Sequence, residues 1–143
     1  MPPYLISEDA FTEFLRRFET GEMPRSEWNH SAHLAVAAAT IHAGGGPAEV
    51  RAKILAYNAT QGIVSTPASG YHETITRFWV ERIRELTAGL GRGATEWDAA
   101  RAVVSAFAHR GRLFSSYYSY DVAACREARA SYRPPDIPDI LRA

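Results

Sequence analysis

The chain has 143 residues, an apolar fraction of 46% and a charged fraction of 22%, which is typical of one globular domain with its own core. Sixteen basic residues balance sixteen acidic ones, so charge gives no reason to expect nucleic acid or an anionic membrane as a partner. A single cysteine, Cys125, excludes an intrachain disulfide and a zinc motif built from cysteines. The first seven residues lack a signal-peptide pattern, and no apolar run approaches the ~20 residues that span a bilayer. We therefore expect a cytoplasmic protein.

Apolar residues recur at helical spacing in five segments, and no long segment alternates as a strand would. The first predicted helix covers residues 7–20, with a capping serine at its start and a glycine after its end. The second begins at Ser26 or Asn29 and ends at His42, before a run of three glycines. Its alanines allow close helix contact, and we expect one face of it, including Leu34, to be apolar.

The third predicted helix covers residues 47–61 and opens on a proline, which suits the first helical position. After a loop, the fourth covers about residues 71–90 and the fifth follows Thr95. Short helices are expected between residues 114 and 132, and the proline-rich end, residues 133–143, is expected to be an extended arm. The pattern predicts an all-α fold, an irregular bundle of five or six helices in a single domain, residues 1–143.

Three histidines stand near two of these helix starts. His30 and His33 are three residues apart, so their side chains are neighbours on one helix, and His72 shares the apolar stripe of the fourth. Three neutral imidazoles are a credible ligand set for a divalent transition metal such as zinc or iron. A bound metal lowers the pKa of a coordinated water, and Glu73 would then act as a ligand or general base.

Other interpretations of the same residues stay open. A histidine near a helix start also serves as a capping or hydrogen-bonded core residue, and HxxH alone is a weak motif. The zinc-protease pattern HExxH fails because Thr76 stands four residues after His72. A carboxylate-bridged di-iron bundle needs two ExxH repeats, and only Glu27 with His30 matches.

Four further residues are candidates for contact with a substrate: Asn58, Thr66, Tyr71 and Tyr117. Tyr117 belongs to an aromatic run, residues 114–120, that suits three roles. The run would line a pocket, form the face of a homodimer, or pack the end of the chain onto the core, and the last role is the more usual for buried aromatic residues.

The chain resembles a widespread group of uncharacterised small bacterial proteins. The resemblance is carried by an aromatic-x-His-x-x-His-Leu segment at residues 28–34 and a Tyr-His-Glu-Thr-Ile-Thr segment at residues 71–76. A Tyr-Tyr-Ser segment at residues 117–119, an Ala-Arg pair and a Pro-Asp pair follow. The resemblance implies that the histidines and Glu73 form one motif set. This chain has Gly70 at a position where a lysine is common in the group. If that lysine contacts a substrate in other members, the resemblance implies that this chain binds a different one.

These observations lead to one leading hypothesis and two alternatives. The leading hypothesis is a metal-dependent enzyme that acts on a small molecule through the histidine and glutamate cluster. In the first alternative, a metal-free accessory protein binds a small molecule with the same histidines. In the second, the chain is a dimerisation module that uses residues 114–120.

Overall fold

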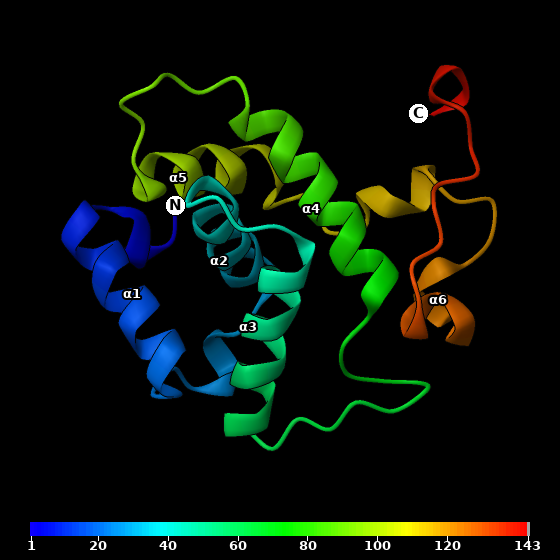
Figure 1. The fold of residues 1–143 in the computed structure, drawn as a ribbon, viewed down its shortest axis with the longest axis horizontal. Helices are drawn as coiled ribbons and strands as arrows, with labels where there is room; N and C mark the ends of the chain where they lie inside the picture. Colours follow the sequence, from blue (N-terminus) through cyan, green and yellow to red (C-terminus); the bar gives the residue numbers. More distant parts are fainter. Residues whose placement is uncertain (143) are drawn as a thin grey trace.

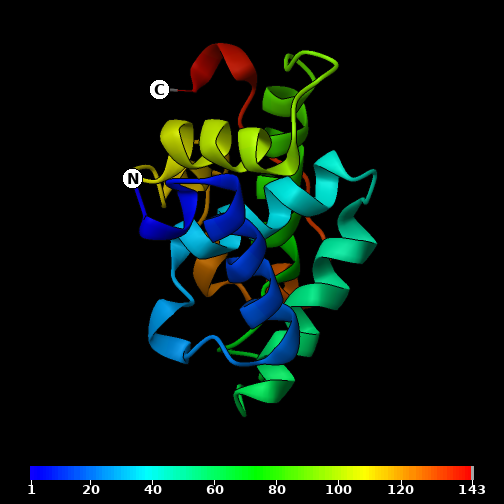
Figure 2. The same ribbon diagram turned by 90° about the vertical axis from the view of Figure 1, so that its left-hand side faces the viewer.

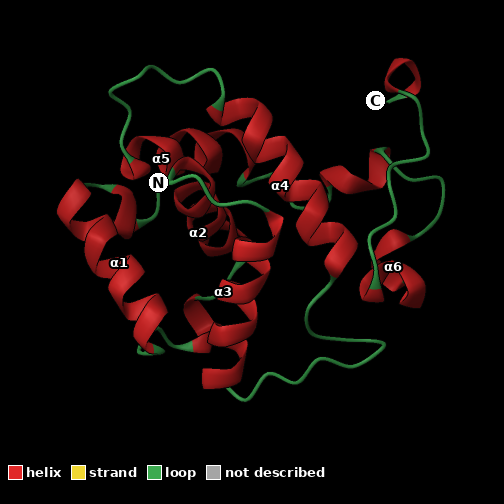
Figure 3. Ribbon diagram, in the orientation of Figure 1, coloured by secondary structure: helices red, strands yellow, loops and turns green. Residues whose placement is uncertain are grey.

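The computed structural model describes residues 1–142, which form six α-helices and five short 3-10 helices around one hydrophobic core (Figures 1 and 3). The α-helices are α1 (Glu8–Thr20), α2 (His30–His42), α3 (Pro47–Thr60), α4 (Glu73–Thr87), α5 (Glu96–Phe107) and α6 (Arg126–Ala130). The 3-10 helices are η1 (Pro3–Leu5), η2 (Arg25–Glu27), η3 (Leu113–Ser116), η4 (Val122–Ala124) and η5 (Asp139–Leu141). The described residues contain no strand, only an isolated bridge between Thr66 and Ser69, so the all-α prediction is confirmed. Within residues 1–142 no helix has the length and apolar character that a membrane crossing requires.

Side-chain caps fix where several helices begin. The Ser7 hydroxyl accepts a hydrogen bond from the Ala10 amide at 3.0 Å, and the Thr95 hydroxyl accepts one from the Asp98 amide at 3.1 Å. Each bond satisfies an amide that has no partner inside its helix. Gly21 ends α1 in the left-handed region, at a φ of 78°, which an L side chain adopts only with strain. These local signals explain why the predicted starts of α1 and α5 agree with the structure.

α2 is the central helix of the molecule. Figure 1 shows it surrounded by α1, α3, α4 and α5, and Figure 2 shows α1 in front of it with α5 above. Eight of its thirteen residues are buried, including every residue from Leu34 to Thr40. The face that was expected to be apolar is buried, and so are residues on the other sides of the helix. Small alanine side chains let neighbouring helices approach on several sides, so a helix with this composition is buried almost all round.

The segment after α5 folds back against the outer side of α4. Phe114 and Tyr118 are buried in the core, and the Tyr118 hydroxyl donates to the Arg133 carbonyl at 2.8 Å. The aromatic run thus packs the end of the chain onto the core, as one of the three interpretations expected. The short helices expected in this region are present as η3, η4 and α6, and η5 interrupts the arm. Residue 143 of the predicted arm lies outside the described residues.

Candidate functional site

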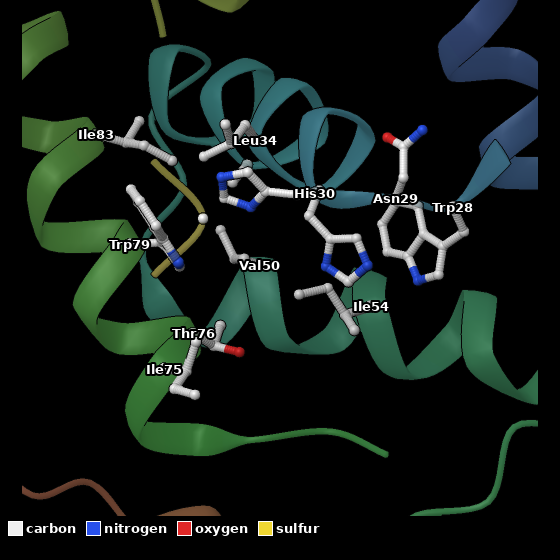
Figure 4. Close-up of a pocket in the computed structure, with 13 residues that line it drawn as sticks. Trp28, Asn29, His30, Leu34, Val50, Ile54, Ile75, Thr76, Trp79 and Ile83 are labelled. Atoms are coloured by element: carbon white, nitrogen blue, oxygen red, sulfur yellow. The ribbon is translucent and has the colours of Figure 1, made fainter. Parts of the chain in front are cut away.

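Two adjoining cavities lie between the first turns of α2, the middle of α3 and the first turns of α4. Their volumes are about 280 Å³ and about 350 Å³. Trp28, His33, Ile54, Ile75 and Thr76 line both cavities, and we call the two together the His33 cleft. Figure 4 shows its inner part, where Ile54, Thr76 and Trp79 face the histidine-bearing start of α2.

The start of α2 places His33 over the cleft. The Asn29 side chain accepts a hydrogen bond from the Ala32 amide at 3.0 Å and so sets where the helix begins. The His33 ring stacks on the Trp28 indole, with 3.8 Å between the ring centroids and an angle of 26° between the planes. Trp28 also contacts Phe18 and Tyr57, with 5.1 Å and 4.8 Å between ring centroids. The imidazole therefore has a rigid aromatic support.

The His33 imidazole is neutral at pH 7. Burial, followed by the nearby charge of His30, lowers its pKa to about 4. Among residues 1–142 no side-chain hydrogen bond is made by His33. A neutral imidazole carries one N–H donor and one acceptor nitrogen, so both functions remain available to a ligand.

Asn58 supplies a second polar group without a partner. It lies on α3, is only 6% exposed and lines the outer part of the cleft. Its backbone carbonyl accepts from the Gln61 and Ile63 amides, whereas its side-chain amide makes no hydrogen bond within the described residues. The amide atoms of Asn58 are not sealed from solvent, because they are not among the buried polar atoms that lack a partner. They face the cavity, where water or a ligand can complete their bonding.

His30 lines the inner part of the cleft and is tied to the backbone of α5. Its Nε2 lies 3.1 Å from the Phe107 carbonyl, and because a carbonyl only accepts, this nitrogen carries the proton. Burial lowers the pKa of His30, and the bond to Phe107 partly offsets that effect. Its ring centroid lies 5.0 Å from that of Trp79. His30 thus has one nitrogen committed to the fold.

His72 has a structural role that uses both of its ring nitrogens. α4 begins at Glu73 rather than near residue 71, because His72 is the residue that caps it. The His72 Nδ1 accepts from the Ile75 amide at 3.1 Å, and Nε2 donates to the Val122 carbonyl at 2.9 Å. Neither nitrogen is free for a metal unless one of these bonds breaks. The capping interpretation of this histidine fits the observed geometry.

Replacing His72 with alanine is expected to lower the free energy of unfolding by about 2 kcal/mol. About 1 kcal/mol comes from the lost cap of α4 and about 1 kcal/mol from the unpaired Val122 carbonyl. His72→Asn should recover about half of the loss, because its shorter side chain supplies a capping oxygen but does not reach Val122. Urea unfolding of the three proteins measures this. Unchanged stability in His72→Ala, together with loss of bound metal, would assign His72 to a metal site instead.

The three histidines and Glu73 do not form a ready metal shell. Across residues 1–142 no group of three or more histidine, cysteine, aspartate or glutamate side chains is placed to hold an ion. His30 and His33 both line the inner cavity, and His33 and His72 both line the outer one, but two of the three rings are bonded to backbone carbonyls. The zinc or iron site thus stays a prediction that this arrangement does not favour.

The other predicted residues are divided among several places. Glu73 accepts a hydrogen bond from the Tyr71 hydroxyl at 2.6 Å and, with Thr66, lines a separate cavity beside α6. Tyr71 lines both that cavity and the His33 cleft. Burial, followed by the bond to Glu73, raises the pKa of Tyr71. Tyr117 lies apart from both spaces and packs edge-on against Phe78, with 4.7 Å between ring centroids.

Several residues of the cleft were not among the predicted site residues. Trp28, Ile54, Ile75 and Trp79 line it, although their spacing placed them in the sequence pattern only as core or motif residues. Of these residues, Trp28 could have been identified from the sequence, because it begins the segment that contains His30 and His33. Nothing in the spacing of apolar residues separates those that face a cavity from those that pack against another side chain.

No family model, no curated protein and no solved structure matches the chain. The residues of the cleft are therefore the basis on which a function can be proposed.

Proposed function

We propose that the His33 cleft binds a small, uncharged and largely apolar molecule that carries a hydroxyl or carbonyl group. His33 and Asn58 would hydrogen-bond that group, while Trp28, Ile54 and Ile75 contact the apolar body. The observation that carries the proposal is the pair of partly enclosed polar side chains, His33 and Asn58, that have no hydrogen-bond partner within the described chain.

The size and polarity of the cleft support this class of ligand. Small-molecule sites are concave, mostly apolar spaces of a few hundred cubic ångströms with a small number of placed polar groups. The two parts of the cleft, about 280 Å³ and about 350 Å³, fall in this range. Among the described lining residues the one formally charged side chain is Arg25, which is exposed at the outer part. A charged ligand would lose its hydration in the inner part without gaining a countercharge.

The metal-dependent enzyme remains a separate hypothesis with a separate test. Its ligand set requires His30 and His72 to give up the bonds to the Phe107 and Val122 carbonyls. Metal-free binding needs no such rearrangement, because it uses the groups that are already free. Elemental analysis of the purified chain distinguishes the two, since the enzyme hypothesis expects near-stoichiometric zinc or iron.

The binding proposal is tested with 2-naphthol and naphthalene, which differ by one hydroxyl. We expect 2-naphthol to quench tryptophan fluorescence saturably and to bind roughly fivefold more tightly than naphthalene, the equivalent of about 1 kcal/mol for one hydrogen bond. Trp28 and Trp79 line the cleft and report occupancy.

His33→Phe is the matched variant, because it keeps a ring on Trp28 and removes both nitrogens. We expect its affinity for 2-naphthol to fall toward that of naphthalene, with naphthalene binding unchanged, while Asn58 still contributes to the binding of the hydroxyl. Equal binding of the two probes by the wild-type chain, or an equal effect of the variant on both, would show that His33 does not recognise the polar group.

A further inference from the structure

A second cavity, of about 730 Å³, lies on the other side of Tyr71 from the His33 cleft. It is open to solvent and is lined by α3, the loop before α4, the first turn of α4, and α6, which lies beside the lower end of α4 in Figure 1. Three arginines line it: Arg51 on α3 and Arg126 and Arg129 on α6. Glu73 is the one carboxylate among the described lining residues. In a chain with zero formal net charge, this cavity is therefore locally positive.

Arg129 is held in place by carbonyl groups alone. Its Nη1 donates to the Gly70 carbonyl at 2.8 Å, and its Nη2 donates to the Ala123 carbonyl at 3.3 Å. Within residues 1–142 Arg129 makes no ion pair with a carboxylate. Its side chain is half-buried. The guanidinium is thus oriented by neutral dipoles, and its charge is left without compensation.

The other two arginines add to this charge. Arg126 precedes Arg129 by three residues on α6, so their side chains leave the same face. Arg126 likewise makes no ion pair in the described chain, and its nearest acidic neighbour in the sequence is Glu127. The Arg51 Nε lies 3.9 Å from Glu73 Oε1, but that oxygen already accepts the Tyr71 hydroxyl at 2.6 Å. One carboxylate therefore faces three guanidinium groups.

The walls of the cavity leave room for more than an inorganic ion. The rings of Tyr71 and Tyr132, with Pro67 and Leu55, supply apolar surface between the arginines. The Tyr132 ring is fixed from outside by Arg77, whose guanidinium carbon lies 4.5 Å from the ring centroid. The cavity therefore combines a charged region with a surface that suits an organic group.

We infer that this cavity binds an organic phosphate monoester. The formal charge of its lining side chains, three arginines against one glutamate, complements a phosphate monoester, which carries between one and two negative charges at pH 7. The planar guanidinium fork donates paired hydrogen bonds to phosphate oxygens, and arginine is favoured over lysine for this purpose. The organic part of the ligand would lie against Tyr71 and Tyr132. This inference does not depend on the ligand proposed for the His33 cleft.

Calorimetric titration of the full chain with phenyl phosphate tests the inference. We expect saturable binding that weakens with added salt, and weaker binding of inorganic phosphate and of benzoate. Arg126→Gln should lower the affinity at least about tenfold, because it removes one of the three guanidinium groups that bind the phosphate. Arg126 is exposed, so its replacement should leave the fold intact. Arg92→Gln is the matched control, since it removes one exposed arginine from the distant loop after α4 and should leave the affinity unchanged.

Two further proteins separate this site from the His33 cleft and from general charge effects. Arg129→Lys keeps the charge but loses the fork, and we expect at least about a fivefold loss. His33→Phe should bind phenyl phosphate as the wild type does. No saturable binding, equal losses in Arg126→Gln and Arg92→Gln, or benzoate binding as tight as that of phenyl phosphate would overturn the assignment.

Discussion

Replacing Phe18 with alanine is expected to lower the free energy of unfolding by about 3–5 kcal/mol, because a large buried ring is removed and a cavity remains. Phe18 is buried on α1 and stacks on Tyr57 with 5.2 Å between ring centroids, in addition to its contact with Trp28. The same change removes the support beneath the ring that carries His33. We therefore expect weaker 2-naphthol binding by whatever protein remains folded.

Urea unfolding followed by circular dichroism measures the loss of stability. Phe18→Leu is the control, since it keeps most of the apolar volume and should cost about 1–2 kcal/mol. A loss below about 1 kcal/mol in Phe18→Ala would mean that the aromatic stack of Phe18, Tyr57 and Trp28 contributes little to the core.

Stability is also expected to fall between pH 7 and pH 4, with about 3 kcal/mol of the loss arising from His33 alone. Its pKa is about 4 in the folded chain, against about 6.5 for an unperturbed histidine. Below pH 6.5 the unfolded chain takes up this proton and the folded chain does not, so the unfolded state is favoured as the pH falls. Above pH 6.5 both states hold a neutral ring, and the effect disappears.

His33→Phe isolates this contribution, because it keeps the ring on Trp28 and cannot be protonated. The free energy of unfolding of wild type and variant should be compared at several pH values between 7 and 4. We expect the variant to lose about 3 kcal/mol less than the wild type over that range. Burial also lowers the pKa of His30 and His72, but these residues are the same in both proteins. Parallel curves would show that His33 is protonated equally easily in both states.

The positions of the helices were predictable because their signals are local. Ser7 and Thr95 cap through amides three residues away, and the glycine that ends α1 follows directly in the chain. The surroundings of α2 were not predictable from its own residues. Its burial depends on α3, α4 and α5, which pack against it. An alanine-rich sequence does not indicate how many helices will approach.

The part of the candidate site that could be predicted also depends on local spacing in the sequence. His30 and His33 are neighbours by helical spacing, and the structure places both in the cleft. The use of both nitrogens of His72 was not predictable, because Val122 lies 50 residues later in the chain. Glu73 and Thr66 are separated from the histidines because Tyr71 lies between the two cavities. Predicting this separation requires the relative positions of α3, α4 and α6, which the sequence does not give.

We propose that the neutral His33 ring forms a hydrogen bond with a ligand in the cleft. The most direct test is a long-range proton–nitrogen correlation spectrum of the five histidine rings, recorded with and without 2-naphthol and with zinc. We expect 2-naphthol to shift one His33 nitrogen by several parts per million while both His72 nitrogens stay unchanged, since those are held by Ile75 and Val122. Unmoved His33 signals at saturating 2-naphthol would show that His33 does not bind the ligand. A joint shift of His30, His33 and His72 on adding zinc would favour a metal centre instead.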